Sequence, residues 1–302
     1  MSRTTGSNML DHHPLRGREL PDVRWGLVAA VLAWVMTVML FANNWYVPGH
    51  IDRPLFNATG GFLSVTLQIG LPATLVVLAM IRFGGGLSLT NFGFTKAAFV
   101  RGMQLAATMW ILLNVWAIYR SLSEGQPIAV AELWRNRPAE ALGILSGQFL
   151  GNAFFEETVF RGFLLAQFYA AIRTTSGRDD SFTVFKTVII VGVLFMLEHV
   201  PNRIMKGDQG SELLGELFGI YLAGLLWSWM YVRTGNLFFT ITAHALHNYP
   251  TLLMDVPGGD RAAKVPASLL AIFIAWMWPV LFRSASGLPK LATASAGTPQ
   301  EE

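Results

Sequence analysis

The apolar run from Ala141 to Ala171 is the feature that most constrains this chain, because it is long enough to cross a membrane and yet contains charged side chains. Two adjacent carboxylates, Glu156 and Glu157, and one guanidinium, Arg161, lie inside it. Ionised groups at the centre of a bilayer cost roughly 2.5–3.5 kcal/mol each on insertion scales, so they are rare there and usually have a function. The run therefore predicts a membrane helix with a functional site inside it.

Helical geometry separates the two glutamates. Glu157 and Arg161 are four residues apart on one helix face and are expected to form an ion pair. Glu156 points about 100° away from that pair, on the same face as Asn152. A carboxylate that is desolvated by neighbouring phenylalanines and has no cationic partner is suited to act as a general base. Glu156 is therefore the predicted base, and Glu157 and Arg161 are its predicted supports.

Composition extends the membrane assignment to the whole chain. Of 302 residues, 53% are hydrophobic and only 14% are charged, whereas soluble domains carry about 25% charged residues. Eight apolar runs are predicted to span the membrane and to pack as an all-α, polytopic helix bundle. They cover residues 25–46, 61–83, 97–119, 141–171, 184–199, 213–232, a stretch from about 237 to 249, and 267–282.

The distribution of basic residues predicts the orientation in the membrane, and the lack of cysteine excludes some kinds of chemistry. With eight spans both termini share a side, and that side carries 13 Lys and Arg against 8 on the other. The positive-inside rule then predicts both termini in the cytoplasm, with the protein in a plasma or inner membrane. The chain has no cysteine, which excludes thiol catalysis and thiolate metal sites. No basic run points to a nucleic-acid partner.

Two motifs later in the chain supply polar side chains that are expected to lie near Glu156. Phe195 and His199 share one helix face, as do His244 and Asn248. Spans four, five and seven are therefore predicted to bring these groups to Glu156. Glu156 and His199 could activate a water molecule, while His244 and Asn248 donate hydrogen bonds to an oxyanion. This chemistry fits hydrolysis of an amide bond.

A metal-dependent version of the same chemistry stays open. Glu156, His199 and His244 form a ligand set of the type that holds catalytic zinc. The usual His-Glu-x-x-His helix is missing, however. We expect no cofactor and favour activation of water without a metal, with zinc as the alternative.

Three motifs in order, Glu156-Glu157-Thr-Val-Phe-Arg161, Phe195-x-x-x-His199 and His244-x-x-x-Asn248, resemble those of the CAAX prenyl endopeptidase type II family. This is the CPBP or Abi group, which includes Ras-converting-type and lysostaphin-resistance-like proteases. The resemblance covers about residues 140–250. It implies an eight-helix intramembrane peptidase whose site opens toward the cytoplasmic leaflet. It also implies that Glu156, His199, His244 and Asn248 are catalytic. The family itself is described both as glutamate-type and as metal-dependent.

The expected domain organisation is a polar cytoplasmic tail at 1–22, one membrane domain at 23–283 with its protease core at about 140–250, and a disordered tail at 284–302. The expected partners are the lipid bilayer and a membrane-anchored or lipidated protein or peptide, such as a prenylated CAAX protein or a C-terminal sorting tail. A non-catalytic scaffold or immunity protein on the same fold is the alternative. A transporter would show inverted repeats, and none is visible.

Three further polar residues near the motifs have no settled role. His247 is interpreted as either a second layer around the site or packing. Glu198 is interpreted as structural or interfacial. Glu216 is placed near the interface with Glu212, with lining of the cavity as the less favoured alternative.

Overall fold

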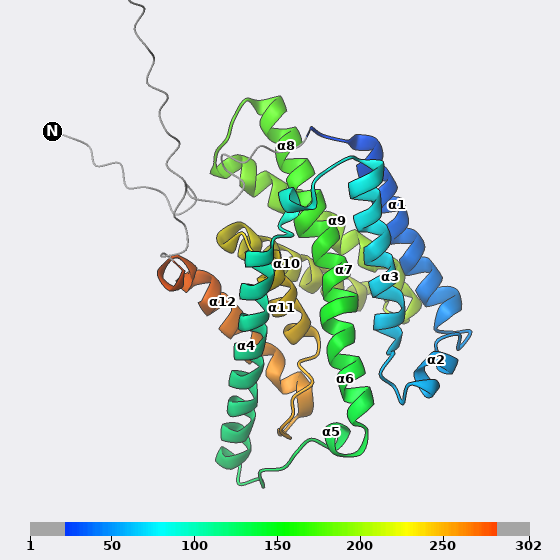
Figure 1. The fold of residues 1–302 in the computed structure, drawn as a ribbon, viewed down its shortest axis with the longest axis vertical. Coiled ribbons are helices and arrows are strands. Elements are labelled where there is room, and N and C mark those ends of the chain that lie inside the picture. Colours follow the sequence, from blue (N-terminus) through cyan, green and yellow to red (C-terminus); the bar gives the residue numbers. More distant parts are fainter. Residues whose placement is uncertain (1–21, 283–302) are drawn as a thin grey trace, which may run out of the picture.

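The computed structural model describes residues 22–282, and within this range the chain is almost entirely helical (Figure 1). No strand forms in this range, and the isolated β-bridge is between Val130 and Met254. The α-helices are α1 Trp25–Phe41, α2 Arg53–Ala58, α3 Val65–Ala79, α4 Lys96–Ser123, α5 Glu132–Asn136, α6 Pro138–Ser146, α7 Ala153–Glu157, α8 Leu165–Ser176, α9 Ser181–Met205, α10 Gly210–Thr234, α11 Leu237–Asn248 and α12 Lys264–Leu281. The predicted all-α class is confirmed, while the tails at 1–22 and 284–302 lie, except for residue 22, outside the described residues.

Short π- and 3₁₀-helical segments join or extend these helices. The π-helical segments are η1 Ala42–Tyr46, η2 Met80–Gly84, η4 Gly147–Asn152 and η5 Thr158–Leu164, and the 3₁₀ segments are η3 Leu89–Phe92 and η6 Gly259–Ala263. Segments η4 and η5 flank α7, so the candidate site is on a helix that changes its winding twice. Such π-helical turns often occur at functional sites.

Six helical segments of the described chain are long and apolar enough to cross a membrane, so the protein is an integral membrane protein with several crossings. They are Trp25–Tyr46, Val65–Gly84, Leu89–Ser123, Ser181–Met205, Gly210–Thr234 and Gly259–Leu281. The predicted count of eight is not confirmed, because the fourth and seventh predicted spans are not among the six. These two are the continuous helix from α6 to α8, which contains the glutamates, and α11.

Helix α11 is short for a membrane span. Its 12 residues cover about 18 Å at 1.5 Å per residue, whereas a bilayer core is about 30 Å thick. The chain beyond α11 is not helical, and the backbone N–H groups of Leu253 and Met254 donate to Asn114 Oδ1 at 2.8 and 3.0 Å. These bonds satisfy two backbone donors of the non-helical segment that follows α11.

Helix α9 is longer than the sequence predicted. The fifth span was expected to end at His199 because Pro201 follows it, but the helix continues to Met205. Proline removes one backbone donor, a loss that neighbouring groups compensate in membrane helices. The extra turn is held by Asn202, whose Nδ2 donates to Asn43 Oδ1 of η1 at 2.7 Å. His199 therefore lies within α9 and not at its end.

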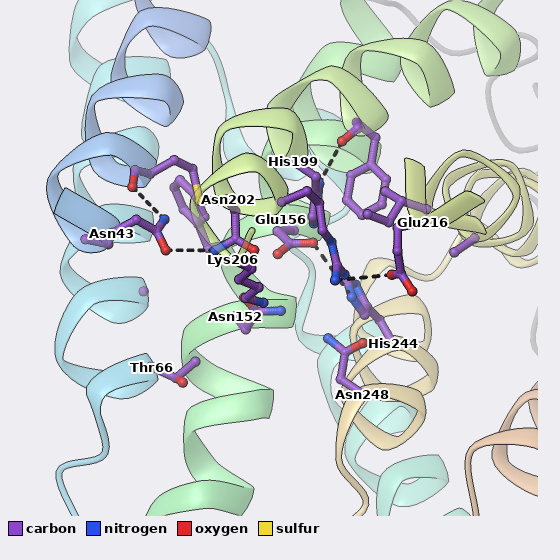
Figure 2. Close-up of a pocket in the computed structure, with 18 of the residues that line it drawn as sticks. Asn43, Thr66, Asn152, Glu156, His199, Asn202, Lys206, Glu216, His244 and Asn248 are labelled. Atoms are coloured by element: carbon purple, nitrogen blue, oxygen red, sulfur yellow. Dashed lines mark hydrogen bonds and ion pairs between the residues drawn. The ribbon is translucent and has the colours of Figure 1, made fainter. Parts of the chain in front are cut away.

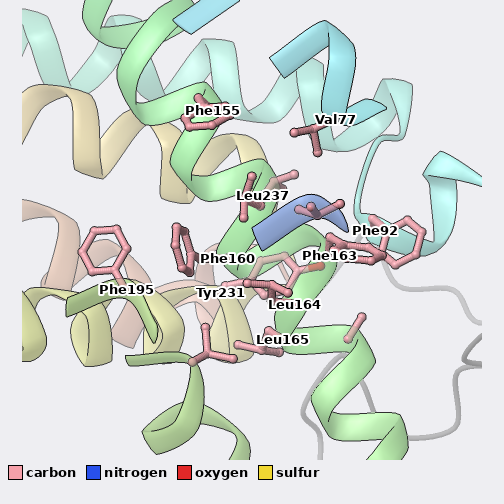
Figure 3. Packing of buried hydrophobic residues seen from close by; sticks show 14 of the residues in the cluster. Val77, Phe92, Phe155, Phe160, Phe163, Leu164, Leu165, Phe195, Tyr231 and Leu237 are labelled. Carbon is pink, nitrogen blue, oxygen red and sulfur yellow. The ribbon is translucent and has the colours of Figure 1, made fainter. Parts of the chain in front are cut away.

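Close contacts at glycines hold the continuous helix from α6 to α8, called the central helix from here on, against α3. Gly143, Gly147 and Gly151 are spaced by four residues on α6 and η4. A Cβ at Gly151 would lie 2.4 Å from Thr66 O, and one at Gly147 would lie 2.5 Å from Ser64 Oγ. Small residues at this spacing let membrane helices approach closely. Farther along the same helix, Figure 3 shows that Phe155, Phe160 and Phe163 belong to a buried hydrophobic cluster with side chains of other elements.

Candidate active site

The predicted ion pair between Glu157 and Arg161 is formed in the structure. Arg161 Nη1 lies 3.0 Å from Glu157 Oε1, and both side chains are 0% exposed. Arg161 Nη2 donates to the carbonyl oxygen of Gly224 on α10 at 2.9 Å. Its guanidinium carbon lies 4.4 Å from the ring centroid of Phe195 on α9. The pair therefore connects the central helix to two neighbouring helices.

His244 contacts both glutamates. Its Nδ1 lies 2.7 Å from Glu157 Oε1, and its Nε2 lies 3.7 Å from Glu156 Oε2. The ring stacks on Trp227 with centroids 5.5 Å apart and planes within 14°. Because an ionised carboxylate only accepts hydrogen bonds, His244 Nδ1 carries a hydrogen and donates a hydrogen bond to Glu157. In a neutral His244 the Nε2 atom is then an acceptor that faces Glu156.

Glu156 has the unpaired character that its helix position predicted. The side chain is 6% exposed, and its Oε2 atom is buried with no hydrogen-bond partner. The gap of 3.7 Å to His244 Nε2 is longer than a direct hydrogen bond. Glu156 therefore has a free oxygen toward the cavity beside it.

His199 is oriented by its own helix. Its Nδ1 donates to the carbonyl oxygen of Phe195 at 2.8 Å. In a neutral His199 ring, Nε2 is then the acceptor. The Phe195 ring lies 4.8 Å from the His199 ring and 5.1 Å from the Phe160 ring. Phe195 thus contacts both His199 and Arg161, and its supporting role stays a prediction.

A cavity of about 820 Å³ lies beside these groups (Figure 2). The four residues predicted to be catalytic all line it. Its polar lining includes Asn43, Asn152, Glu156, His199, Asn202, Arg203, Lys206, Glu216, His244, His247, Asn248 and Lys264. The structure therefore brings spans four, five and seven to one polar space, while helices α1, α3, α10 and α12 complete its wall.

The cavity lies near matching ends of its helices. It is lined by residues at the ends of α1, α9 and α11 and at the beginnings of α3, α10 and α12. Because these six termini contribute residues to one cavity, they lie toward one end of the helix bundle. Helix α1 begins on the other side, and Figure 1 shows the beginning of α1 near α8, away from α2 and α5.

The structure places the two unsettled glutamates beside the cavity. Glu216 lines it, as its less favoured alternative has it, and pairs with Arg203 at 3.2 Å with a side chain that is 50% exposed. Its placement near the interface with Glu212 stays a prediction. Glu198, interpreted as structural or interfacial, is 4% exposed and lies beside His199.

His247 and Trp227 form a layer behind His244. His247 Nδ1 lies 2.8 Å from Ser268 Oγ of α12, and its ring meets Trp227 at 5.4 Å. Trp227 is 1% exposed. Sequence reasoning missed Trp227, since no local spacing on α10 points to a histidine on α11. It also missed Asn43 and Asn202, which meet across a gap in sequence of 159 residues.

The alternative ligand set for zinc does not assemble in this geometry. Among residues 22–282, no group of three or more His, Asp or Glu side chains lies close enough to hold a metal ion. The side chains as placed therefore do not fit the zinc version of the site.

Apolar helices that enclose a cavity lined by glutamates and histidines define a membrane protein with a polar site inside its helix bundle. Comparison with known families agrees: residues 138–250 match the family described as type II CAAX prenyl endopeptidase, Rce1-like. This segment is therefore similar to a protease family, and the resemblance drawn from the three motifs is confirmed. No curated protein and no solved structure matches the chain.

Proposed function

We propose that this protein is an intramembrane endopeptidase that hydrolyses a peptide bond of a membrane-anchored substrate by a Glu156- and His199-activated water. The observation that carries the proposal is the buried, unpartnered oxygen of Glu156 on a cavity that His199, His244 and Asn248 also line. A general base must reach the proton that it removes, and a free carboxylate oxygen beside a water-sized space satisfies this requirement. The match to a protease family supports the same reaction class.

In the proposed reaction, a water molecule between Glu156 and His199 Nε2 attacks the carbonyl carbon of the peptide bond. Its oxygen forms the new bond while one proton passes to Glu156, which produces a tetrahedral oxyanion. Glu156 then gives this proton to the amine nitrogen as the carbon–nitrogen bond breaks. His199 Nε2 accepts the remaining hydroxyl proton, so the products are a carboxylate, an amine and a protonated His199.

The two oxyanion donors have different requirements. The Asn248 side-chain amide can donate a hydrogen bond without any change of protonation. His244 donates Nδ1–H to Glu157, so its Nε2 stabilises an oxyanion only when that atom carries a proton as well. A doubly protonated His244 between Glu156 and Glu157 is compatible with the two carboxylates that face it. We therefore assign the oxyanion to Asn248 together with protonated His244.

The test is a cleavage assay in proteoliposomes with a panel of lipidated and transmembrane peptides. Glu156→Gln keeps the shape of the side chain but removes the base, and we expect a loss of turnover of about 100-fold or more. Glu212→Gln, an exposed carboxylate of α10 outside the cavity, is the matched control and should cleave normally. Normal turnover by Glu156→Gln would refute Glu156 as the base, whereas no cleavage of any peptide by wild type would favour a non-catalytic scaffold or immunity protein.

Chelation separates the proposed metal-free reaction from its zinc-dependent version. We expect wild-type cleavage to persist in the presence of a strong chelator, because the described carboxylate and imidazole side chains do not converge as a metal site. Loss of cleavage that added zinc restores would replace the water-activation step with a metal-dependent one. The peptide panel also decides whether a prenylated C-terminus or a C-terminal sorting tail is the preferred substrate.

A further inference from the structure

Glu198 is a third buried carboxylate beside the candidate site, and the reaction above does not use it. It lies on α9, is 4% exposed, and both of its carboxylate oxygens are buried without a hydrogen-bond partner. Its Oε2 atom lies 3.4 Å from His199 Nδ1. A carboxylate with no partner at membrane depth is costly, and such residues usually have a function.

The charged groups around Glu198 leave His199 as its available partner. Glu156 of α7 and Arg161 of η5 face it from the central helix. Arg161 is bound to Glu157 and to the Gly224 carbonyl oxygen, so it forms no direct pair with Glu198. Arg203, which faces His199 from the next turn of α9, pairs with Glu216 at 3.2 Å.

We propose that Glu198 is a positioning residue for His199 that stabilises the imidazolium formed during turnover, an inference that rests on the proposed peptidase function. His199 Nδ1–H donates to the Phe195 carbonyl oxygen at 2.8 Å, and Glu198 Oε2 lies 3.4 Å from the same nitrogen as a neighbouring charge. Together they hold the proton on Nδ1 and keep Nε2 free to accept one from the tetrahedral intermediate. When His199 becomes charged, the Glu198 carboxylate balances that charge, as the aspartate does behind the histidine of a serine-protease triad.

The first test compares Glu198→Gln with wild type and with the control Glu212→Gln in the cleavage assay over a range of pH. Removing a negative charge from beside an imidazole makes it lose its proton at lower pH. We therefore expect the limb of the pH profile that reports His199 to move to lower pH by about one unit, with kcat about tenfold lower at neutral pH and KM unchanged. A profile identical to that of Glu212→Gln would overturn the inference.

The second test does not depend on peptidase activity. Histidines labelled with ¹⁵N are titrated by NMR in nanodiscs, with His199→Gln to assign the signal, and Glu198→Gln should shift the His199 titration to lower pH. If wild type cleaves nothing, the proposed function fails while this titration still decides the role of Glu198. If Glu198→Gln does not fold, Glu198→Asp keeps the charge but retracts it, and an unchanged His199 titration in that variant overturns the inference.

Discussion

The Glu157 and Arg161 pair is the residue-scale feature on which the candidate site depends, because each charge is buried and each has the other as its counterion. Glu157 also holds His244 Nδ1 at 2.7 Å. Removing one member of a buried pair leaves an uncompensated charge, which is far more costly than the pair itself is stabilising. The stability of the central helix and the orientation of His244 therefore depend on one carboxylate.

Glu157→Gln should destabilise the protein strongly, because Arg161 would remain buried without its counterion. We expect a loss of about 3–5 kcal/mol, measured as a lower melting temperature of the detergent-solubilised protein. Glu124→Gln breaks an exposed pair with Arg120 at the same four-residue spacing and should cost less than about 0.5 kcal/mol. Equal melting temperatures for the two variants would show that the buried pair is not stabilising.

Of the contacts that Glu157 makes, the local one could be predicted from the sequence and the long-range one could not. The Glu157 and Arg161 pair is local, so four-residue spacing on a helix predicted it. The contact between Glu157 and His244 joins residues 87 positions apart, and motif order alone placed them near one another without fixing which glutamate meets the histidine. Burial of Glu198 was missed because it depends on how the neighbouring helices cover α9.

At the element scale, the contact between α3 and the central helix depends on glycines that sequence reasoning did not use. A Cβ at Gly151 would lie 2.4 Å from Thr66 O, and backbone cannot move aside as a flexible side chain can. We expect Gly151→Ala to cost about 1–3 kcal/mol, the usual range for overpacking, seen as a lower melting temperature. Gly26→Ala on α1, where no atom lies within 4 Å, should leave it nearly unchanged.

The beginning of α9 carries a cap whose strength depends on pH. The Thr183 backbone N–H donates to Asp180 Oδ1 at 2.9 Å, and this bond holds the pKa of Asp180 below its usual value. A lowered pKa means that the carboxylate stabilises the fold above about pH 4 and that this contribution is lost as the pH falls through the folded-state value.

Asp180→Asn provides the comparison, because asparagine also caps helices but does not titrate in this range. The melting temperature of wild type should exceed that of Asp180→Asn near neutral pH, and the difference should shrink as the pH is lowered toward 3. A difference that stays constant over this range would show that the cap is not sensitive to protonation.

At the scale of the whole molecule, two expectations from the sequence exclude each other. The side that holds both termini carries 13 Lys and Arg and the other side carries 8, which predicts that the termini are cytoplasmic. The family resemblance, in contrast, implies a site that opens to the cytoplasmic leaflet. The cavity is lined by residues at the ends of α1, α9 and α11 and at the beginnings of α3, α10 and α12. That side is opposite to the side on which α1 begins, so only one of the two expectations can hold.

Because the chain has no cysteine, single-cysteine labelling decides between them without background. Ser176→Cys lies at the end of α8, before α9 begins, and Ser211→Cys lies at the beginning of α10; both positions are exposed. From the charge bias, we expect a membrane-impermeant maleimide to label Ser211→Cys in intact cells and Ser176→Cys only after permeabilisation. The cavity would then open away from the cytoplasm, and the substrate would have to present its cleaved bond there. The reverse labelling would make the site cytoplasmic and would show that the tails and loops on the side of the termini, despite their 13 basic residues, do not set the orientation.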